Sequence, residues 1–336
     1  MLEKVIGRVL AGHDLPMQEM ADTMDAVMDG RCDDAEVAVL LTALRGKGES
    51  VSEVAGAALA MRQHMTPIRT RRQQVVDTCG TGGDASGTFN ISTAAALVAA
   101  AAGIAVAKHG NRSITSKTGS ADVLEALGVQ IEAEVPIIER CLDELGFCFC
   151  FAPRMHASMR HVAAVRRRLG VPTIFNLLGP LCNPASAPYQ LLGVGRPEVR
   201  ELMADALMML GTRRALVVSG SDGLDEVTLN GATRVIEATA RQSREFSWSP
   251  ADFGLRESSL ASIRVEGPQA SAAMVRDVLA GKTGVARDIV IINAAAALWT
   301  AGQSESPRDC ATLAADAIDS GRAANVLAEL VALTNA

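Results

Sequence analysis

The stretch VVDTCGTGGD at residues 75–84 is followed by NISTAAALVAA at 90–100 and by IAVAK at 104–108. A short apolar run, a glycine-rich turn, an alanine-rich segment and a second apolar run predict a strand, a loop, a helix and another strand. The same rhythm returns at 122–151 and at 191–219. Alternation of this kind predicts an α/β fold with a mostly parallel central sheet flanked by helices.

Two parts of the chain depart from this rhythm. Residues 1–68 have helical periodicity, and the rhythm breaks again at 154–186, where a helical run covers 155–169. We therefore predict a small discontinuous helical domain of residues 1–68 and 155–186, and an α/β domain of residues 69–154 and 187–336. Helices are predicted at 16–29, 33–47, 51–65, 92–102, 122–127, 136–145, 197–210, 271–280, 285–300, 310–319 and 323–333, and a strand at 129–133.

Composition limits the possible classes of protein. The 336 residues are 49% hydrophobic, which excludes general disorder, and carry a net charge of −6, which excludes an overall basic surface for nucleic acid but leaves local basic patches open. The seven cysteines form no CxxC pair, which favours reduced thiols and a cytoplasmic location. The longest apolar run, at 94–107, is too short to cross a membrane.

The first candidate site is the glycine-rich turn after the first predicted strand. Gly80, Gly82 and Gly83 allow backbone amides to approach an anion, and the segment 90–93 opens a helix whose free amides favour negative charge. The long polar run favours a phosphate or pyrophosphate over a simple capped turn. A nicotinamide dinucleotide is excluded, because no acidic residue occurs at 100–107, where that motif requires one.

Two further loops supply polar groups at strand ends. KHGNRS at 108–113, running on to Ser120, carries cations and hydroxyl groups suited to phosphate oxygens. The turn SDGLDE at 221–226 carries neighbouring carboxylates suited to magnesium, although acidic turns are often simply solvated. Because the carboxyl ends of parallel strands meet at one edge of a sheet, we expect these loops to lie close together.

A fourth candidate is the helix that carries His156, Met159, Ala163 and Arg166, whose spacing places all four along one face. Arg166 could bind a substrate carboxylate through two hydrogen bonds. For His156, a structural and a catalytic role both remain open. No Ser-His-Asp or Cys-His arrangement stands out in the sequence.

Taken together, these motifs resemble the anthranilate phosphoribosyltransferase family over nearly the whole chain. The resemblance rests on GTGGD at 80–84, NIST at 90–93, KHGNR at 108–112, SKTGSADVLEALG at 116–128, FAP at 151–153, TIFNLLGPLCNPA at 173–185 and DGLDE at 222–226. It implies transfer of phosphoribosyl from phosphoribosyl pyrophosphate (PRPP) to the amine of anthranilate in tryptophan biosynthesis. It also implies two magnesium ions with PRPP and a homodimer formed through the helical domains.

The resemblance also implies roles for individual residues, matched motif by motif. The implied PRPP site comprises Gly80, Gly83, Asp84, Thr88, Asn90, Ile91, Ser92, Thr93, Lys108, Gly110 and Ser120. The implied anthranilate contacts are Gly80, His109, Asn111 and Arg166, and the implied magnesium ligands are Ser92, Asp225 and Glu226. No obligatory general base is expected, because an aniline nitrogen is already neutral near pH 7.

Alternative functions predict different observations. A nucleoside phosphorylase of the same fold group would use free phosphate, and such chains are usually longer. A phosphoribosyltransferase could also use another aromatic acceptor. A non-catalytic relative that binds nucleic acid would carry a basic surface and would have lost Asp225, Glu226, Asn111 or Arg166, all of which are present here.

Overall fold

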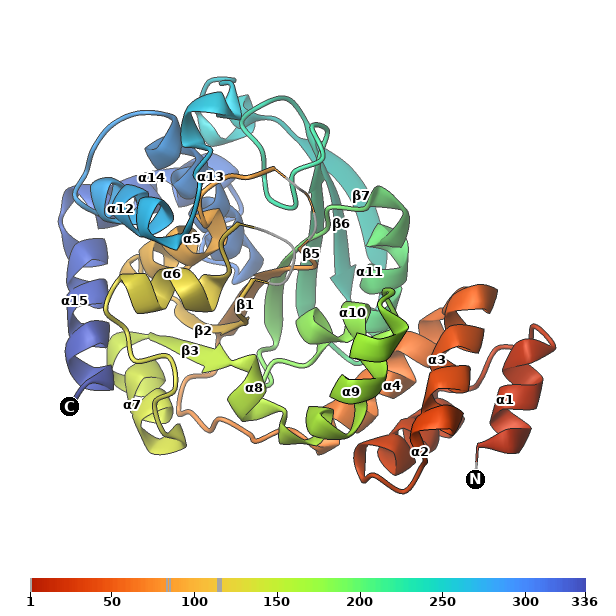
Figure 1. The fold of residues 1–336 in the computed structure, drawn as a ribbon. Helices are drawn as coiled ribbons and strands as arrows, with labels where there is room; N and C mark the ends of the chain where they lie inside the picture. The colour runs from red at the N-terminus through yellow and green to blue at the C-terminus, as the bar shows by residue number, and fades with distance from the viewer. Residues whose placement is uncertain (1, 83, 85, 114–116) are drawn as a thin grey trace.

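A seven-stranded sheet lies at the centre of the computed structural model, which describes residues 2–82, 84, 86–113 and 117–336 (Figure 1). The strand order is β3-β2-β1-β4-β5-β6-β7. Neighbours from β3 to β5 pair in parallel, and β6 and β7 are added antiparallel at one edge. The strands are β1 (Val75–Gly80), β2 (Ala105–Gly110), β3 (Phe147–Phe151), β4 (Tyr189–Gly193), β5 (Arg214–Gly220), β6 (Thr233–Thr239) and β7 (Ser243–Trp248).

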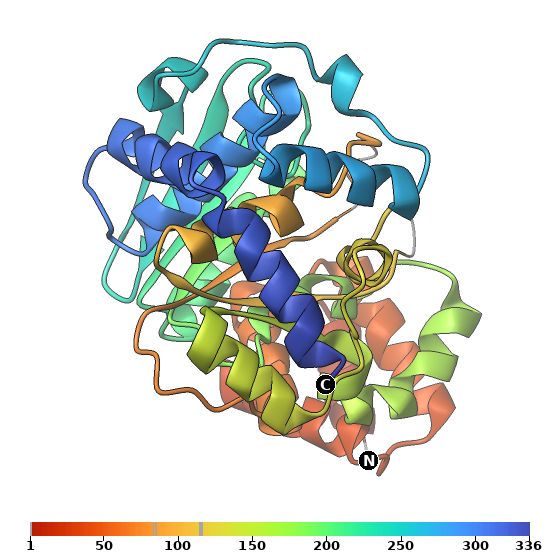
Figure 2. The same ribbon diagram turned by 90° about the vertical axis from the view of Figure 1, so that its left-hand side faces the viewer.

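Helices pack on both faces of the sheet. Most belong to the α/β part: α5 (Ile91–Ala101), α6 (Ser120–Ala126), α7 (Val135–Leu145), α11 (Arg200–Met209), α12 (Pro268–Leu279), α13 (Val285–Thr300), α14 (Pro307–Asp319) and α15 (Arg322–Thr334). Figure 2 shows α15 lying beside α7 on the outside of the molecule. Short 3₁₀ turns occur at Ala157–Met159, Gly179–Leu181, Pro197–Val199, Pro250–Phe253 and Leu260–Ile263.

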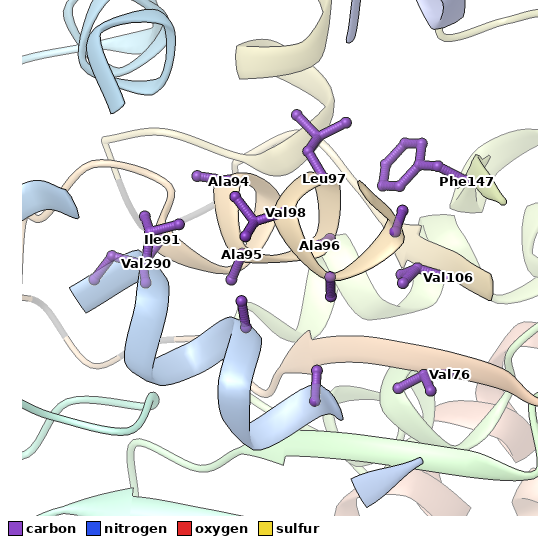
Figure 3. Packing of buried hydrophobic residues seen from close by; sticks show 14 of the residues in the cluster. Val76, Ile91, Ala94, Ala95, Ala96, Leu97, Val98, Val106, Phe147 and Val290 are labelled. Carbon is purple, nitrogen blue, oxygen red and sulfur yellow. The ribbon is translucent and has the colours of Figure 1, made fainter. Parts of the chain in front are cut away.

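The larger core is built around the alanine-rich helix α5. Its residues from Ile91 to Ala101 are buried except Ser92, because α5 packs on the sheet beside α13, which also contacts the sheet (Figure 3), and is covered by α14 and α15. Small alanine side chains let the helix backbone approach the sheet closely, while Leu97 and Val98 fill the remaining space. This packing fixes the N-terminus of α5 at the carboxyl edge of β1.

The remaining helices gather at one side of the sheet (Figure 1). They are α1 (Glu3–Leu10), α2 (Met17–Met28), α3 (Asp34–Lys47), α4 (Val51–Gln63), α8 (Ala152–Met155), α9 (Arg160–Leu169) and α10 (Phe175–Leu178). Residues 162–182 contribute Val162, Val165 and Ile174 to the same apolar cluster as α2, α3 and α4. No helix among the described residues has both the length and the apolar character needed to cross a bilayer.

Several local predictions were wrong. The segment 129–133 is a loop: its residues alternate between buried and exposed, but they pack against α15, and the amide of Gln130 donates to Thr334 Oγ1 at 3.2 Å. The predicted helix at 155–169 breaks at His156, whose backbone turns there (φ −122°, ψ 61°). Helix α1 and strands β6 and β7 were not predicted, because their apolar patterns are short and mixed with charge.

Candidate active site

The acidic turn after β5 lies directly over the ends of β1 and β4. The amide of Gly82 donates to Asp225 Oδ2 at 3.1 Å. A Cβ atom at Gly193 would lie 1.6 Å from the Asp225 carbonyl oxygen, and one at Gly80 would lie 2.6 Å from Asp225 Oδ2. Only glycine therefore allows this approach. At Gly195 a Cβ atom would lie 3.1 Å from Asp84, so the same strand end also makes room for the glycine-rich loop.

The carboxylates brought together there are short of positive charge. Burial, followed by the neighbouring Asp84 carboxylate, raises the pKa of Asp225 to about 7. Burial and the charge of Asp225 raise the pKa of Glu226 well above its ordinary value, and Lys108 only partly opposes that rise. Like charges that are crowded in a partly desolvated site favour a bound cation.

Lys108 connects these carboxylates to the start of α5. Its ammonium is buried and donates to the carbonyl of Thr78 at 2.6 Å and to Ser92 Oγ at 3.0 Å. Burial lowers its pKa, while the charges of Asp77 and Glu226 oppose that effect. Ser92 therefore contacts both groups. Its hydroxyl accepts from Lys108, and its backbone amide lowers the pKa of the candidate metal ligand Glu226.

The start of α5 is capped by residues predicted for the PRPP site. Asn90 Oδ1 accepts from the amide of Thr93 at 3.1 Å and also from the Thr93 hydroxyl. The amide of Asn90 donates to Ser271 Oγ at 2.9 Å, and Ile91 is buried in the core. Thr88 pairs with Arg264 in an isolated bridge. Gly83 lies outside the described residues.

The loop after β2 brings Gly110, Asn111 and Ser120 together. Ser120 Oγ lies 3.5 Å from the carbonyl oxygen of Asn111, and a Cβ atom at Gly110 would lie 2.1 Å from Ser120 Oγ. Besides Lys108, the stretch from 108 to 120 contains two cations, Arg112 and Lys117, and both are paired with carboxylates. Arg112 donates to both oxygens of Glu125 at 2.8 and 2.9 Å, and Lys117 donates to Glu266 at 2.7 Å. Of the three cations in this stretch, only Lys108 contacts the candidate metal-binding cluster.

His109 and His156 form a buried pair at the end of β2. Their Nε2 atoms are 3.2 Å apart, and His109 Nδ1 lies 3.1 Å from the carbonyl oxygen of Gly179, to which it donates. Burial lowers the pKa of His109 to about 3 and that of His156 to about 4. Both rings are therefore neutral at pH 7. This contact explains why the chain turns at His156.

Arg166 is a half-buried cation with no acidic partner among the described residues. Its guanidinium lies 5.4 Å from the centre of the Phe175 ring, and burial lowers its pKa. No hydrogen bond joins Arg166 to Asn111 among the described residues. An unpaired guanidinium that is partly withdrawn from water is suited to bind a carboxylate.

The donor set fits magnesium. Within the part of the chain that the structure describes, no three His, Cys, Asp or Glu side chains form a complete metal-binding cluster. Asp225 and Glu226 instead supply two adjacent carboxylates at the sheet edge, and the backbone amide of Ser92 lies close enough to Glu226 to lower its pKa, while the Ser92 hydroxyl accepts from Lys108. Magnesium is usually held by one or two protein carboxylates together with water and substrate phosphates, so an incomplete oxygen set is what this ion needs.

Comparisons with known proteins agree with this geometry. Residues 72–324 match the glycosyl transferase family, a/b domain, and residues 3–65 match the helical bundle domain of that family. An anthranilate phosphoribosyltransferase of Rhodopirellula baltica is 50% identical over 95% of this chain and 93% of its own length. The chain belongs to the anthranilate phosphoribosyltransferase family. A second family member, from Moorella thermoacetica, is 49% identical over 99% of this chain and 98% of its own.

Solved structures of the anthranilate phosphoribosyltransferase family have the same fold. The enzyme of Thermus thermophilus superposes with a TM-score of 0.92 at 43% identity, over 98% of this chain and 99% of that chain. A Saccharomyces cerevisiae enzyme in complex with PRPP and Mg superposes with a TM-score of 0.90 at 29% identity, over 99% of this chain and 98% of that one.

Sequence reasoning missed two glycines of the site. Gly193 and Gly195 accept the close approach of Asp225 and Asp84, but the sequence predicts only a strand at 191–194, which includes Gly193, and no role for Gly195. The two glycines of LLGVG at 191–195 are a signal that could have revealed this approach. Two glycines at the end of a strand indicate that another segment lies close to the backbone.

Proposed function

We propose that this chain transfers the 5-phosphoribosyl group of PRPP to the amine of anthranilate, with release of pyrophosphate, as a step of tryptophan biosynthesis. One observation carries the proposal: the acidic turn at 222–226 lies against the glycine-rich loop and the start of α5, with Lys108 between them. This arrangement suits a polyphosphate held together with a divalent cation. The sequence identity of 49 to 50% to the two relatives named above, over nearly the full length of the chain, supports the same reaction.

PRPP would bind at the carboxyl ends of β1 and β2. The amides of the glycine-rich loop and of the first turn of α5 would bind its phosphates, together with Thr88, Lys108 and Ser120. Asp225, Glu226 and Ser92 would hold magnesium, for which we expect two ions with PRPP. Magnesium supplies positive charge to the pyrophosphate as that group leaves. Lys108 and the fixed amides would stabilise the same developing charge.

Anthranilate would be oriented from the other side of the crevice. Arg166 would bind its carboxylate, and Asn111, Gly80 and His109 would position the ring and the amine for attack on ribose C1. The histidine pair supports a mechanism without an obligatory general base. His109 and His156 are neutral at pH 7 and face each other through Nε2, so neither offers a free basic nitrogen at that atom.

The role of Arg166 has its own test. Arg166→Ala should raise the KM for anthranilate by about 10-fold or more while the KM for PRPP changes little, because a charge-assisted pair is lost from one substrate only. Steady-state kinetics with each substrate varied separately measures the split. Arg167→Ala, an exposed neighbour on the same helix, is the control. Equal losses for both substrates contradict this role.

The reaction itself is tested by the loss of anthranilate fluorescence on addition of PRPP and magnesium, with and without EDTA. Magnesium-dependent loss with one pyrophosphate formed per anthranilate consumed supports the proposal. A folded protein that binds PRPP but leaves anthranilate unchanged indicates another aromatic acceptor. Cleavage of a nucleoside that depends on free phosphate indicates the phosphorylase instead.

The domain division and the assembly are proposals as well. We propose that residues 1–68 and 155–186 act as one helical domain that forms a homodimer. An open groove of about 480 Å³ between α1 and α3 supports this, because the exposed apolar side chains Leu10 and Val39 line it. Sedimentation equilibrium of the whole chain distinguishes a dimer from a monomer.

A cytoplasmic location stays a prediction. It rests on the seven cysteines, all of which are free thiols.

A further inference from the structure

Strands β1 and β2 stop pairing before they end. Their parallel register stops at Val76 opposite Val106. On its other edge β1 stays paired with β4 as far as Gly80, and β2 stays paired with β3 as far as Gly110. The backbone ladder between β1 and β2 therefore ends before their carboxyl ends, where the sheet carries the candidate substrate residues.

Side chains replace the missing ladder hydrogen bonds. The amide of His109 donates to Asp77 Oδ1 at 3.2 Å, and the carbonyl of Thr78 accepts from Lys108 Nζ at 2.6 Å. The carbonyl of Ala107 accepts from Asn183 Nδ2 at 2.8 Å. These backbone groups are thus satisfied although the ladder has ended, which removes the main cost of ending it there.

The groups around Asp77 favour its ionised form, and its Oδ1 accepts from the His109 amide, while its Oδ2 has no hydrogen-bond partner among the described residues. Burial raises its pKa to about 6, and the Asn183 amide, the Lys108 ammonium and the His109 amide oppose that rise. All three are donors or cations. The orientation of the Asn183 amide is fixed, because its Oδ1 accepts from the amide of Ala185 at 2.9 Å. Asp77 also lines a polar cavity of about 160 Å³ behind the sheet.

Asp77 accepts a hydrogen bond from the peptide that joins Lys108 to His109 in β2. The side chains of these two residues reach opposite sides of the candidate site. Successive side chains of a strand point to opposite faces. Lys108 accordingly reaches Ser92 and the PRPP side, whereas His109 reaches Gly179 and His156 on the side of the helical domain. A shift of this peptide would move both side chains together.

We propose that Asp77, supported by Asn183, is a positioning residue for the transfer reaction, because it replaces a ladder contact between β1 and β2 and thereby fixes Lys108 and His109 at the crevice. The inference rests on the proposed function. Asp77 is completely buried and contacts residues of the site rather than the substrates themselves. Its effect should therefore appear in kcat, which depends on alignment, more than in either KM.

The test is Asp77→Asn in the full chain, a substitution of equal size. It places an amide donor beside the hydrogen-bond donors of Asn183, Lys108 and His109. We expect kcat to fall by about 100-fold, with the KM for PRPP and for anthranilate each within about 3-fold of wild type. Glu237→Gln is the matched control, because it also removes a buried carboxylate charge from the sheet, at β6, far from the crevice along the strand order. It should leave kcat within about 2-fold, even if the melting temperature falls as far as in Asp77→Asn.

Asn183→Ala provides a second variant should Asp77→Asn fail to fold. It removes the donor to Ala107 and should lower kcat by about 10-fold with the same small change in KM. Variants that keep kcat within about 3-fold of wild type, or that raise a KM instead, overturn the inference. A wild-type enzyme that forms no pyrophosphate overturns the proposed function and this inference with it, whereas active wild type and active Asp77→Asn overturn the inference alone.

Discussion

Two regions of the same sheet hold carboxylates beside cations, with opposite balances of charge. On β6, the single carboxylate of Glu237 accepts from Arg214 at 2.7 Å and also from Arg244. At the end of β5, the carboxylates of Asp225 and Glu226 lie with Asp84 near one ammonium, that of Lys108. The first region is neutralised within the protein. The second has more carboxylates than cations, so that a divalent cation can neutralise them and in turn bind a polyphosphate.

The comparison teaches how a structural ion pair differs from a binding site. Arg214 also lies 3.9 Å from the centre of the Trp299 ring, so its position is determined by packing as well as by charge. Around Asp225 the structure instead provides glycines and backbone amides, which leave space and donate hydrogen bonds without filling the site. The second region thus keeps strong electrostatic interactions available for a ligand.

The largest expected effect is on activity. Glu226→Gln should lower kcat/KM by about 1000-fold at saturating magnesium, because it removes one of two carboxylates proposed to hold the ion. Pyrophosphate release measures it. The same substitution at Glu237 should leave kcat/KM nearly unchanged. Activity of Glu226→Gln within about 10-fold of wild type would break the distinction between the two regions.

The next effect is on stability, and its sign should differ between the regions. At pH 7 without metal, Glu237→Gln should lower the free energy of unfolding by about 2 kcal/mol, since it leaves Arg214 without its charged partner. Glu226→Gln should raise it, because the pKa of Glu226 is raised in the folded state and its ionised form is therefore destabilising.

Urea unfolding as a function of pH checks that sign. The advantage of Glu226→Gln should disappear below about pH 4, where the glutamate is protonated in both the folded and the unfolded protein. A loss of stability in Glu226→Gln at pH 7 would show that the carboxylate is already neutralised within the protein, as Glu237 is.

The smallest expected effect is on the pH dependence of stability. It concerns the buried pair His109 and His156, which is neutral, unlike the two carboxylate regions. The pKa of His156 is lowered to about 4 in the folded protein, so its contribution to stability is complete above about pH 6.5 and is lost as the pH falls. Between pH 7.5 and 6 the loss should stay below about 1 kcal/mol per histidine. His156→Gln should reduce this dependence, whereas the exposed His13→Gln should not; identical pH profiles for the two variants would contradict it.

Much of the site could be predicted because its motifs are local. The capped start of α5 at Asn90 follows from residue type and spacing, and so does the glycine-rich turn before it. The antiparallel edge β6–β7 could not be predicted, because the exposed charges of Arg244 and Glu245 interrupt its apolar pattern. The break at His156 depends on a partner, His109, that lies 47 positions earlier in the chain.

The sequence by itself determined the strand, helix and strand β1, α5 and β2 around the glycine-rich turn, the position of that turn and the residue types available for chemistry. These depend on hydrophobic period and on hydrogen bonds between near neighbours. Only the tertiary structure decided that Gly82 meets Asp225, 143 positions away, and that Asp77 accepts from the amide of His109 on the neighbouring strand. Such contacts depend on strand order and on how closely two backbones can approach, and neither is encoded in a local pattern.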